Sequence, residues 1–226
     1  MFESAKLQSF YENQMPITHK EVIDSTTEMM LWQITESENE LKKGLSLSKE
    51  AQNRLSERKS DSHRKGYLAV RQLLNQHGIA PQIHQYEANG APYLTDGRFI
   101  SISHTKNIAA IVIANSPVGI DVEHYQQKII QIAPRFMHQK EIDNTTQENK
   151  MHYYTHFWTA KEAIYKVFNT AGTHFAEQIY IQPFSSETKV GKGHVNIKNK
   201  IFNFKLHFFD FKDYCVTLAK AINVKL

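Results

Sequence analysis

The pattern of apolar and polar residues along the 226-residue chain predicts alternating blocks of helix and strand. A Thr-x-x-Glu capping box at 35–38 predicts a helix that ends near Gly44, and Ser48 begins a second helical region whose strongest part is 66–74. Short apolar runs bounded by turn residues predict strands at 83–86, 99–103, 108–114 and 118–123. We expect a long amphipathic helix over about 151–169 and, after it, strands at 178–182, 194–197, 201–209 and 214–219.

This order of elements, helix then strands and again helix then strands, predicts an α+β fold made of two similar lobes. We expect the N-terminal lobe to comprise residues 1–116 and the C-terminal lobe residues 117–226, with the junction near 115–118. No readable sequence identity links the two halves, so this expectation depends on the order of the elements alone.

Composition and charge narrow the classes of partner. The formal net charge is +4, and such a modest positive excess suits a nucleotide, a phosphorylated cofactor or an acidic protein. The sequence contains no nucleic-acid-binding motif and no apolar run of the roughly 18 residues that a membrane span needs. We recognise no secretory signal at the N-terminus, and the single cysteine, Cys215, cannot form an internal disulfide. We therefore expect a cytoplasmic protein that binds neither nucleic acid nor membrane.

Two carboxylates share one face of a predicted strand in the segment Gly119-Ile120-Asp121-Val122-Glu123. Side chains two residues apart on a strand point to the same side, so Asp121 and Glu123 project together. Carboxylates this close repel each other unless a cation lies between them, and all-oxygen ligands favour magnesium, manganese or calcium over zinc. An isolated Asp-x-Glu is more often a strand end with solvated acids, so the interpretation needs support from elsewhere in the chain.

The long helix carries a second group of candidate residues in the segment Phe157-Trp158-Thr159-Ala160-Lys161-Glu162-Ala163-Ile164-Tyr165-Lys166. Trp158, Glu162 and Lys166 are spaced four apart and line one face of the helix. A surface ion pair between Glu162 and Lys166 is the simplest interpretation. The apolar residues around them indicate instead that some charges lie near the core, where each needs an opposite charge. A metal beside Glu162 and a phosphate beside Lys166 would supply these.

A third segment, Ile100-Ser101-Ile102-Ser103-His104-Thr105, places two serines on one strand face and a histidine at the following turn. A lone histidine after a strand is usually a turn or core residue. A Ser-His pair beside basic residues is equally typical of a phosphate site.

Together these segments resemble the surfactin-synthetase-activating type of 4'-phosphopantetheinyl transferase. The family's paired signature of a Gly-Ile-Asp-Val-Glu strand and a Trp-Thr-x-Lys-Glu-x-x-x-Lys helix is present at 119–123 and 158–166. An Ile-Ser-His-Thr strand stands at 102–105, an arginine with a leucine pair at 71–74, and a Phe-x-x-x-x-Glu element at 136–141. The match runs in the family's order from about residue 45 to 170, and paired motifs at this spacing are strongly specific.

The resemblance implies a pseudo-twofold α+β fold with coenzyme A as substrate in the cleft between the lobes. Asp121, Glu123 and Glu162 would hold Mg²⁺, with Mn²⁺ as the other candidate. The serine of an apo acyl or peptidyl carrier protein would then attack coenzyme A, and 3',5'-ADP would leave. Glu162 or Glu141 would take the proton of that serine, and the sequence does not choose between them. Lys161 is assigned a flanking role in coenzyme A binding.

The phosphates of coenzyme A are assigned to basic and hydroxyl side chains. The resemblance and the charge pattern give Lys166 to the α- and β-phosphates, Ser103 and His104 to the 3'-phosphate, and Arg71 and Lys59 to weaker cationic roles. Many family members carry a lysine in a Gly-Lys-Pro segment at the position of Ala91. This cationic contact is either missing or supplied by another residue, for instance Arg98 or Lys106.

Two other functions use the same residues. A phosphohydrolase acting on coenzyme A or a nucleotide would need the same three carboxylates, and a non-catalytic coenzyme A binding module would need only the cleft. We expect a monomer, because two lobes on one polypeptide build the whole site. Residues 128–140, with their basic and apolar side chains, are the predicted docking surface for the acidic carrier, although the apolar ones could equally be core.

Overall fold

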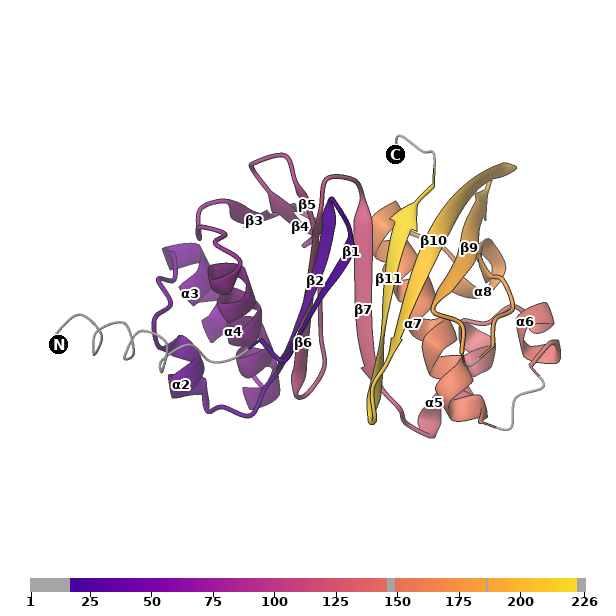
Figure 1. Cartoon of the computed structure of the whole chain (residues 1–226), viewed down its shortest axis with the longest axis horizontal. Coiled ribbons are helices and arrows are strands. Elements are labelled where there is room, and N and C mark those ends of the chain that lie inside the picture. The colour runs from indigo at the N-terminus through magenta and orange to yellow at the C-terminus, as the bar shows by residue number, and fades with distance from the viewer. Residues whose placement is uncertain (1–16, 146–148, 186, 223–226) are drawn as a thin grey trace, which may run out of the picture.

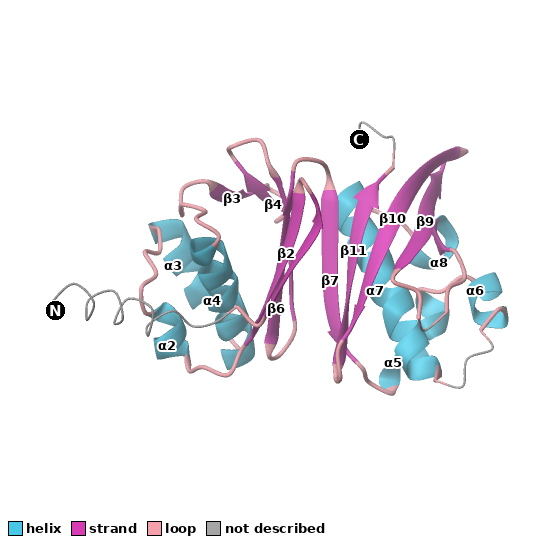
Figure 2. Cartoon of the chain, viewed as in Figure 1, coloured by secondary structure: helices cyan, strands magenta, loops and turns pink. Residues whose placement is uncertain are grey.

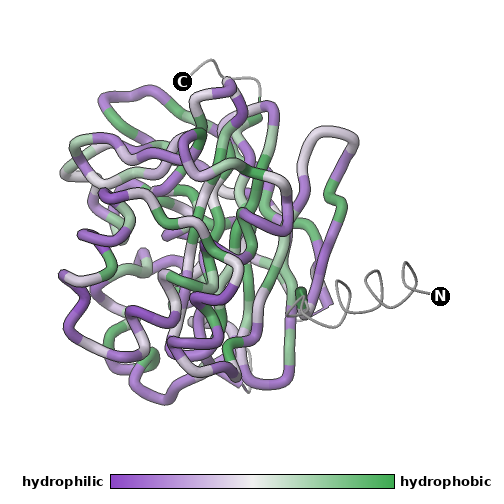
Figure 3. The backbone as a smooth tube through the Cα atoms, turned by 90° about the vertical axis from the view of Figure 1, so that its left-hand side faces the viewer, coloured by the Kyte–Doolittle hydropathy of each residue, from purple (hydrophilic) through white to green (hydrophobic). Residues whose placement is uncertain are grey.

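Two antiparallel sheets meet at the centre of the molecule, and helices cover the outer face of each (Figure 1, Figure 2). The computed structural model describes residues 17–145, 149–185 and 187–222. The hydrophobic segments of the chain run through the interior, whereas hydrophilic segments lie mostly at the periphery (Figure 3). The layers are therefore helix, sheet, sheet and helix.

The first sheet has the strand order β1-β2-β6-β5. Its strands are β1 (His19–Asp24), β2 (Thr27–Gln33), β5 (Phe99–His104) and β6 (Ile108–Ala114). The helices beside it are α2 (Glu38–Lys42), α3 (Lys49–Ser56) and α4 (Asp61–Gln76), and a small hairpin joins β3 (His84–Tyr86) to β4 (Pro92–Leu94). Trp32, Leu68 and Ile111 are fully buried between this sheet and α4, so apolar burial holds the N-terminal helices in place.

The second sheet has the order β7-β11-β10-β9-β8. Its strands are β7 (Val118–His124), β8 (Ile179–Ile181), β9 (Val190–Ile197), β10 (Lys200–Asp210) and β11 (Tyr214–Ala221). The associated helices are α5 (Lys128–Ile132), the 3-10 turn η1 (Ala133–Arg135), α6 (Gln139–Asp143), α7 (Lys150–Phe168) and α8 (Phe175–Gln178). Phe157 and Ile164 of α7 pack with Phe204 in the core beneath this sheet.

A third apolar layer and two serines join the sheets. Leu31 and Val112 of the first sheet pack with Ile120 and other residues of the second. Ser101 Oγ accepts a hydrogen bond from the backbone N of Ile120 at 3.0 Å, and Ser103 Oγ accepts one from Val122 at 3.3 Å. These bonds hold β5 beside β7, so the strand that ends at His104 lies next to the strand that carries Asp121 and Glu123.

The predicted α+β class, with antiparallel sheets and helices in each half, is confirmed. The predicted capping box at 35–38 is wrong by two residues: Ser37 caps the helix, and its backbone N donates to Glu40 Oε2 at 2.8 Å. The hairpin of β1 and β2 was not predicted. No helix within the described ranges is long and apolar enough to cross a membrane.

Candidate active site

The two carboxylates of β7 face helix α7 because a glycine lets strand and helix approach closely. A Cβ added at Gly119 would lie 2.0 Å from the backbone oxygen of Ala163, so no larger residue fits there. Gly119, Asp121 and Glu123 alternate along the strand and share its face. The structure thereby brings Asp121 and Glu123 to the helix that carries Glu162 and Lys166, as the sequence predicted.

Asp121 is buried and only half satisfied. Its Oδ1 accepts hydrogen bonds from Ser103 Oγ and from Lys166 Nζ, each at 2.8 Å. Its Oδ2 is also buried but has no hydrogen-bond partner within the described residues. A buried carboxylate oxygen without a partner is costly, so this atom is a candidate ligand for a cation.

Ionisation of Glu123 and Glu162 is unfavourable beside Asp121, and the raised pKa values of both glutamates show this. Burial raises the pKa of Glu162 to about 7, with a further contribution from the charge of Asp121. Burial and then Asp121 also raise the pKa of Glu123, although Trp158 Nε1 donates to its Oε1 at 3.3 Å. Three carboxylates that oppose one another's ionisation fit a hard divalent cation, which favours the ionised forms.

The carboxylates do not form a ready metal cage as they stand. Over the ranges that the structure describes, no three His, Cys, Asp or Glu side chains form a group that could hold a metal ion. Lys166 contacts Asp121 and Trp158 contacts Glu123, so both carboxylates already use one oxygen. The unpartnered Oδ2 of Asp121 and the raised pKa values are what make the set suitable for a cation.

A cleft of about 300 Å³ opens beside the carboxylates, between the helices of the first lobe and β5. Its lining includes Arg58, Arg71 and Lys166, which form a positive wall, together with His104 and the rings of Tyr67 and Tyr86. The guanidinium carbons of Arg58 and Arg71 lie 4.1 and 4.0 Å from the ring centroid of Tyr67. The cleft is therefore cationic, and aromatic rings hold two of its arginines in place.

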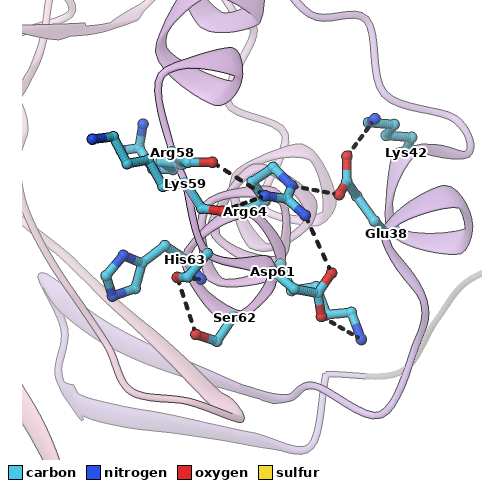
Figure 4. A network of polar contacts seen from close by, with 10 residues as sticks. Glu38, Lys42, Arg58, Lys59, Asp61, Ser62, His63 and Arg64 are labelled. Carbon is cyan, nitrogen blue, oxygen red and sulfur yellow. Dashed lines mark hydrogen bonds and ion pairs between the residues drawn. The ribbon is translucent and has the colours of Figure 1, made fainter.

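Arg58 reaches the cleft because a polar network fixes the turn between α3 and α4. Arg64 Nε donates to Glu38 at 2.7 Å, and Arg64 Nη1 donates to the backbone oxygens of Arg58 and Lys59. Figure 4 shows Arg58, Lys59 and His63 projecting on the side of Arg64 away from Glu38. Arg64 thus acts as an anchor, and its neighbour Arg58 supplies the charge in the cleft.

His104 stands at the mouth of the cleft, where another glycine makes room for it. A Cβ at residue 66 would lie 2.9 Å from His104 Nδ1, so the imidazole packs directly over Gly66. Its side chain is exposed at the surface, yet the cleft walls desolvate it, and with His63, Arg58 and Lys166 nearby its pKa is lowered. A phosphate would favour the protonated imidazole and reverse this shift.

Glu141 and Lys161 do not reach this site. Both side chains are fully buried, and Lys161 Nζ lies 2.7 Å from Glu141 Oε2. The lysine also donates to the backbone oxygens of Phe175 and Ile179, while Glu141 accepts from His138 N and Ile181 N. The prediction of Glu141 as a base and of Lys161 as a coenzyme A contact is corrected: together they form a structural ion pair.

Other predicted phosphate contacts are also revised. The hydrogen of the Ser103 hydroxyl goes to Asp121, so as the side chains stand it has none to donate to a phosphate. Lys59 is exposed and lies outside the lining of the cleft, which its neighbour Arg58 enters. Arg98 pairs with Asp96 at 2.6 Å, and neither Arg98 nor Lys106 lines the cleft.

Comparison with protein-family models decides the family. Residues 117–219 match the 4'-phosphopantetheinyl transferase superfamily, and residues 49–114 match the 4'-phosphopantetheinyl transferase N-terminal domain. The two matches are separated only by residues 115 and 116 and follow the order of the two lobes. The chain belongs to the 4'-phosphopantetheinyl transferase superfamily.

Two curated relatives are similar to this superfamily member. The 4'-phosphopantetheinyl transferase gsp of Aneurinibacillus migulanus is 25% identical over 137 residues, which cover 59% of this chain and 57% of the relative. A 4'-phosphopantetheinyl transferase of Bacillus subtilis is 28% identical over 151 residues, which cover 62% of this chain and 64% of the relative. The match thus spans less than two thirds of either relative. The family resemblance drawn from the motifs is confirmed.

The sequence interpretation of this 4'-phosphopantetheinyl transferase homologue missed three residues of the cleft. Arg58 was not among the predicted phosphate contacts, although its neighbour Lys59 was. Tyr67 and Tyr86 were read as parts of a helix and a strand. Arg54 of α3 and Arg71 of α4 both lie over the ring of Tyr86 in β3, and such contacts between separate elements leave no pattern in the sequence.

Proposed function

We propose that this protein transfers the 4'-phosphopantetheine group of coenzyme A to a serine of an apo acyl or peptidyl carrier protein. The single observation that carries the proposal is the cationic cleft beside three mutually repelling carboxylates, in a chain of this family. The serine oxygen attacks the β-phosphorus, the bond from that phosphorus to the bridging oxygen breaks, and 3',5'-ADP leaves with the bond electrons.

Asp121, Glu123 and Glu162 would hold a magnesium or manganese ion. The unpartnered Asp121 Oδ2 and the raised pKa values of both glutamates support this assignment. When bound, such an ion supplies positive charge that neutralises the pyrophosphate oxygens as the bridge breaks. Lys166 holds its ammonium against Asp121 and also lines the cleft, so its charge faces both the carboxylates and an incoming phosphate.

Glu162 is the candidate general base. It is partly accessible, and an ionised carboxylate beside the attacking serine can take its proton. We prefer Glu162 to Glu141 for this role, because Lys161 and two backbone N–H groups occupy the buried oxygens of Glu141. The serine proton would therefore pass to Glu162.

The phosphates of coenzyme A would bind along the positive wall of the cleft. Arg58 and Arg71 are held by tyrosine rings, which reduces the conformational freedom lost when a phosphate binds. His104 stands at the mouth, where protonation would add a fourth charge to those of Arg58, Arg71 and Lys166. Arg58 is the residue that we propose in place of the lysine missing at Ala91, because Arg98 is paired elsewhere.

The carrier would dock beside residues 128–140. Lys128, Arg135 and Lys140 are exposed and would attract an acidic partner. Ile129 and Phe136 are 7% and 2% exposed, so they belong to the core and contribute no docking surface. We further propose a monomer in a reducing cytoplasm that needs neither nucleic acid nor membrane. Both lobes of one chain supply the cleft, and Cys215 is buried and unpaired.

The deciding experiment combines the protein with coenzyme A, Mg²⁺ and a panel of apo carriers, and measures the intact mass of each carrier. A carrier whose acceptor serine is replaced by alanine is the matched control. Transfer is supported if a carrier with its acceptor serine gains the mass of one phosphopantetheine and the alanine control carrier does not. Cleavage of coenzyme A with no gain in carrier mass would show a phosphohydrolase, and neither change would show a binding module.

A further inference from the structure

A second, smaller pocket lies in the N-terminal lobe behind the cleft. It is enclosed by α3, the loop before it, α4 and β3, and has a volume of about 130 Å³. Tyr67, Arg71 and Tyr86 line both this inner pocket and the cleft, so they form the wall between the two. The inner pocket is not lined by Asp121, Glu123, Glu162 or Lys166, and it is therefore separate from the proposed transfer chemistry.

The body of the inner pocket is apolar. Its lining includes Leu45, Leu47, Leu74, Ile79 and Pro81. A cavity of roughly 150 Å³ lined by aliphatic side chains is large enough for one benzene ring. The inner pocket is thus the right size for a single ring or a short branched chain.

A buried histidine points to a ligand with a polar group. His84 of β3 is 8% exposed and lines the inner pocket, and its Nε2 has no hydrogen-bond partner in the part of the chain that the structure describes. Burial, with Arg71 and Arg54 nearby, lowers the pKa of His84 to about 3, so the imidazole is neutral near pH 7. Nε2 can therefore form a hydrogen bond with a ligand without adding charge.

The shared wall carries a positive charge that no acid neutralises. Arg71 Nη2 donates to Tyr67 Oη at 2.6 Å and to Tyr86 Oη at 3.3 Å, but its buried Nη1 has no partner among the described residues. No described carboxylate forms an ion pair with Arg71, whereas Arg54 pairs with Glu50 at 3.0 Å. The inner pocket is also lined by the paired Arg54 and Glu50, whose charges offset each other, so it presents one uncompensated guanidinium and one neutral imidazole beside an apolar floor.

We propose that the inner pocket binds a small monocarboxylate with an aromatic or branched aliphatic body. The carboxylate would accept hydrogen bonds from Arg71 and His84, and the body would lie against Leu74 and Ile79. A single negative charge matches the single free guanidinium, and a charge-assisted hydrogen bond to arginine is stronger than a neutral one. Binding would satisfy both buried polar atoms at once.

Binding would also affect the cleft, a second step that rests on the proposed function. A carboxylate on Arg71 would neutralise a charge that coenzyme A phosphates would otherwise meet. The two ligands would then oppose each other, and each would weaken the other by the same factor.

The first experiment measures benzoate binding to the full chain, without coenzyme A, by isothermal titration and ligand-observed NMR. Benzamide, which has the same ring and no charge, is the matched control ligand. We expect benzoate to bind saturably and about tenfold or more tightly than benzamide, as the loss of a charged hydrogen bond implies. Equal affinity of the two ligands would overturn the proposal, as would the absence of saturable benzoate binding.

Two variants locate the site. Ala51→Leu narrows the inner pocket from α3, and His84→Leu removes the unpaired nitrogen; each should weaken benzoate binding about tenfold or more. Gln85→Leu, at the exposed neighbouring position of β3, is the control and should bind as wild type. Circular dichroism and Tm confirm that each variant is folded, and His84→Leu decides if Ala51→Leu does not fold. Benzoate binding unchanged in the folded variants would place the ligand elsewhere and overturn the proposal.

The coupling has its own measurement. The Kd for coenzyme A is determined with and without saturating benzoate, and we expect an increase of about fivefold. An unchanged Kd would overturn the coupling while the benzoate titration still decides the site. Failure of phosphopantetheine transfer would overturn the proposed function without touching either result.

Discussion

Two lysines of helix α7 pair with carboxylates from other elements, Lys161 with Glu141 of α6 and Lys166 with Asp121 of β7, and the two pairs differ in how completely their atoms are hydrogen-bonded. Lys161 and Glu141 are fully buried, and each finds further partners in the backbone. Lys166 is partly accessible and Asp121 is buried, with one oxygen of Asp121 unpartnered and two glutamates of raised pKa beside it. The first pair has no capacity for a ligand, whereas the second does. Residue type alone does not separate a structural pair from a site, but hydrogen-bond satisfaction does.

The largest effect is expected from neutralising Glu162 at the unsatisfied pair. Glu162→Gln should lower the rate of phosphopantetheine transfer by about 10²–10⁴-fold, because it removes a proposed base and metal ligand. Its Tm should be unchanged or higher, since one of three repelling charges is gone. Transfer is followed by carrier mass and Tm by differential scanning fluorimetry. An unfolded Glu162→Gln protein would show that the residue is structural after all.

The satisfied pair should behave in the opposite way. Lys161→Met leaves Glu141 charged and unpaired in the core, which should reduce the free energy of unfolding by about 3–5 kcal/mol. The double variant Lys161→Met with Glu141→Leu should recover much of this loss, because no buried charge remains. Urea denaturation measures both proteins. A stable Lys161→Met protein that has lost only activity would contradict the assignment and return Lys161 to the site.

The raised pKa of Glu162 predicts a pH dependence of stability. The ordinary value is 4.5 and the folded value about 7, so between these pH values the folded state holds a proton that the unfolded state has lost. The contribution of Glu162 to stability should therefore fall as pH rises from about 4.5 to 7, by at most about 3 kcal/mol. Glu162→Gln should lack this fall.

The measurement is the free energy of unfolding in urea at pH 5 and pH 8, for wild type and Glu162→Gln. Only the difference between the two proteins is interpreted, since groups away from the three carboxylates titrate equally in both. Mg²⁺ should stabilise wild type more at pH 8 than at pH 5, because ionised carboxylates bind it better. Parallel pH profiles for the two proteins would refute the strained state of Glu162.

Two serines on β5 offer a finer comparison. Ser103 donates to Asp121 and Ser101 accepts only from the backbone of Ile120. Each hydrogen bond is worth about 1 kcal/mol, so Ser103→Ala, which also loses the bond from Val122 N, should lose more stability than Ser101→Ala. Ser103→Ala alone should also slow transfer, by roughly tenfold, because Asp121 loses a donor that orients it. Equal transfer rates for Ser101→Ala and Ser103→Ala would remove the positioning role of Ser103.

The smallest effect is expected at the proposed docking surface. Arg135→Glu and Lys140→Glu should raise the KM for the carrier a few-fold and leave the KM for coenzyme A nearly unchanged. The same carrier KM should rise with ionic strength, because exposed charges are screened beyond about 8 Å at physiological salt. Steady-state kinetics at two salt concentrations tests both. A carrier KM that ignores salt and both substitutions would move docking away from residues 128–140.

The short-range spacing of residues along strands and helices explains what could be predicted from the sequence. The alternation that places Asp121 beside Glu123 and the four-residue spacing of Trp158, Glu162 and Lys166 depend only on strand and helix geometry. The missed strand β2 shows where this reasoning stops. Met29 and Leu31 pack in the core between the sheets, while Met30 and Trp32 pack toward the helices. A strand buried on both faces has no alternation to detect.

The sequence by itself therefore determined the fold class, the family motifs and the faces on which the carboxylates and Lys166 lie, because these follow from short-range spacing. Only the tertiary structure decided which charges remain available. Glu141 and Lys161 are twenty positions apart in number, and their pairing depends on how α6 packs against α7. Arg58 enters the cleft and Lys59 does not. Arg64, which pairs with the distant Glu38, donates to the backbone of this turn and holds it in place. Partner choice among buried charges is settled by long-range packing, which no local pattern records.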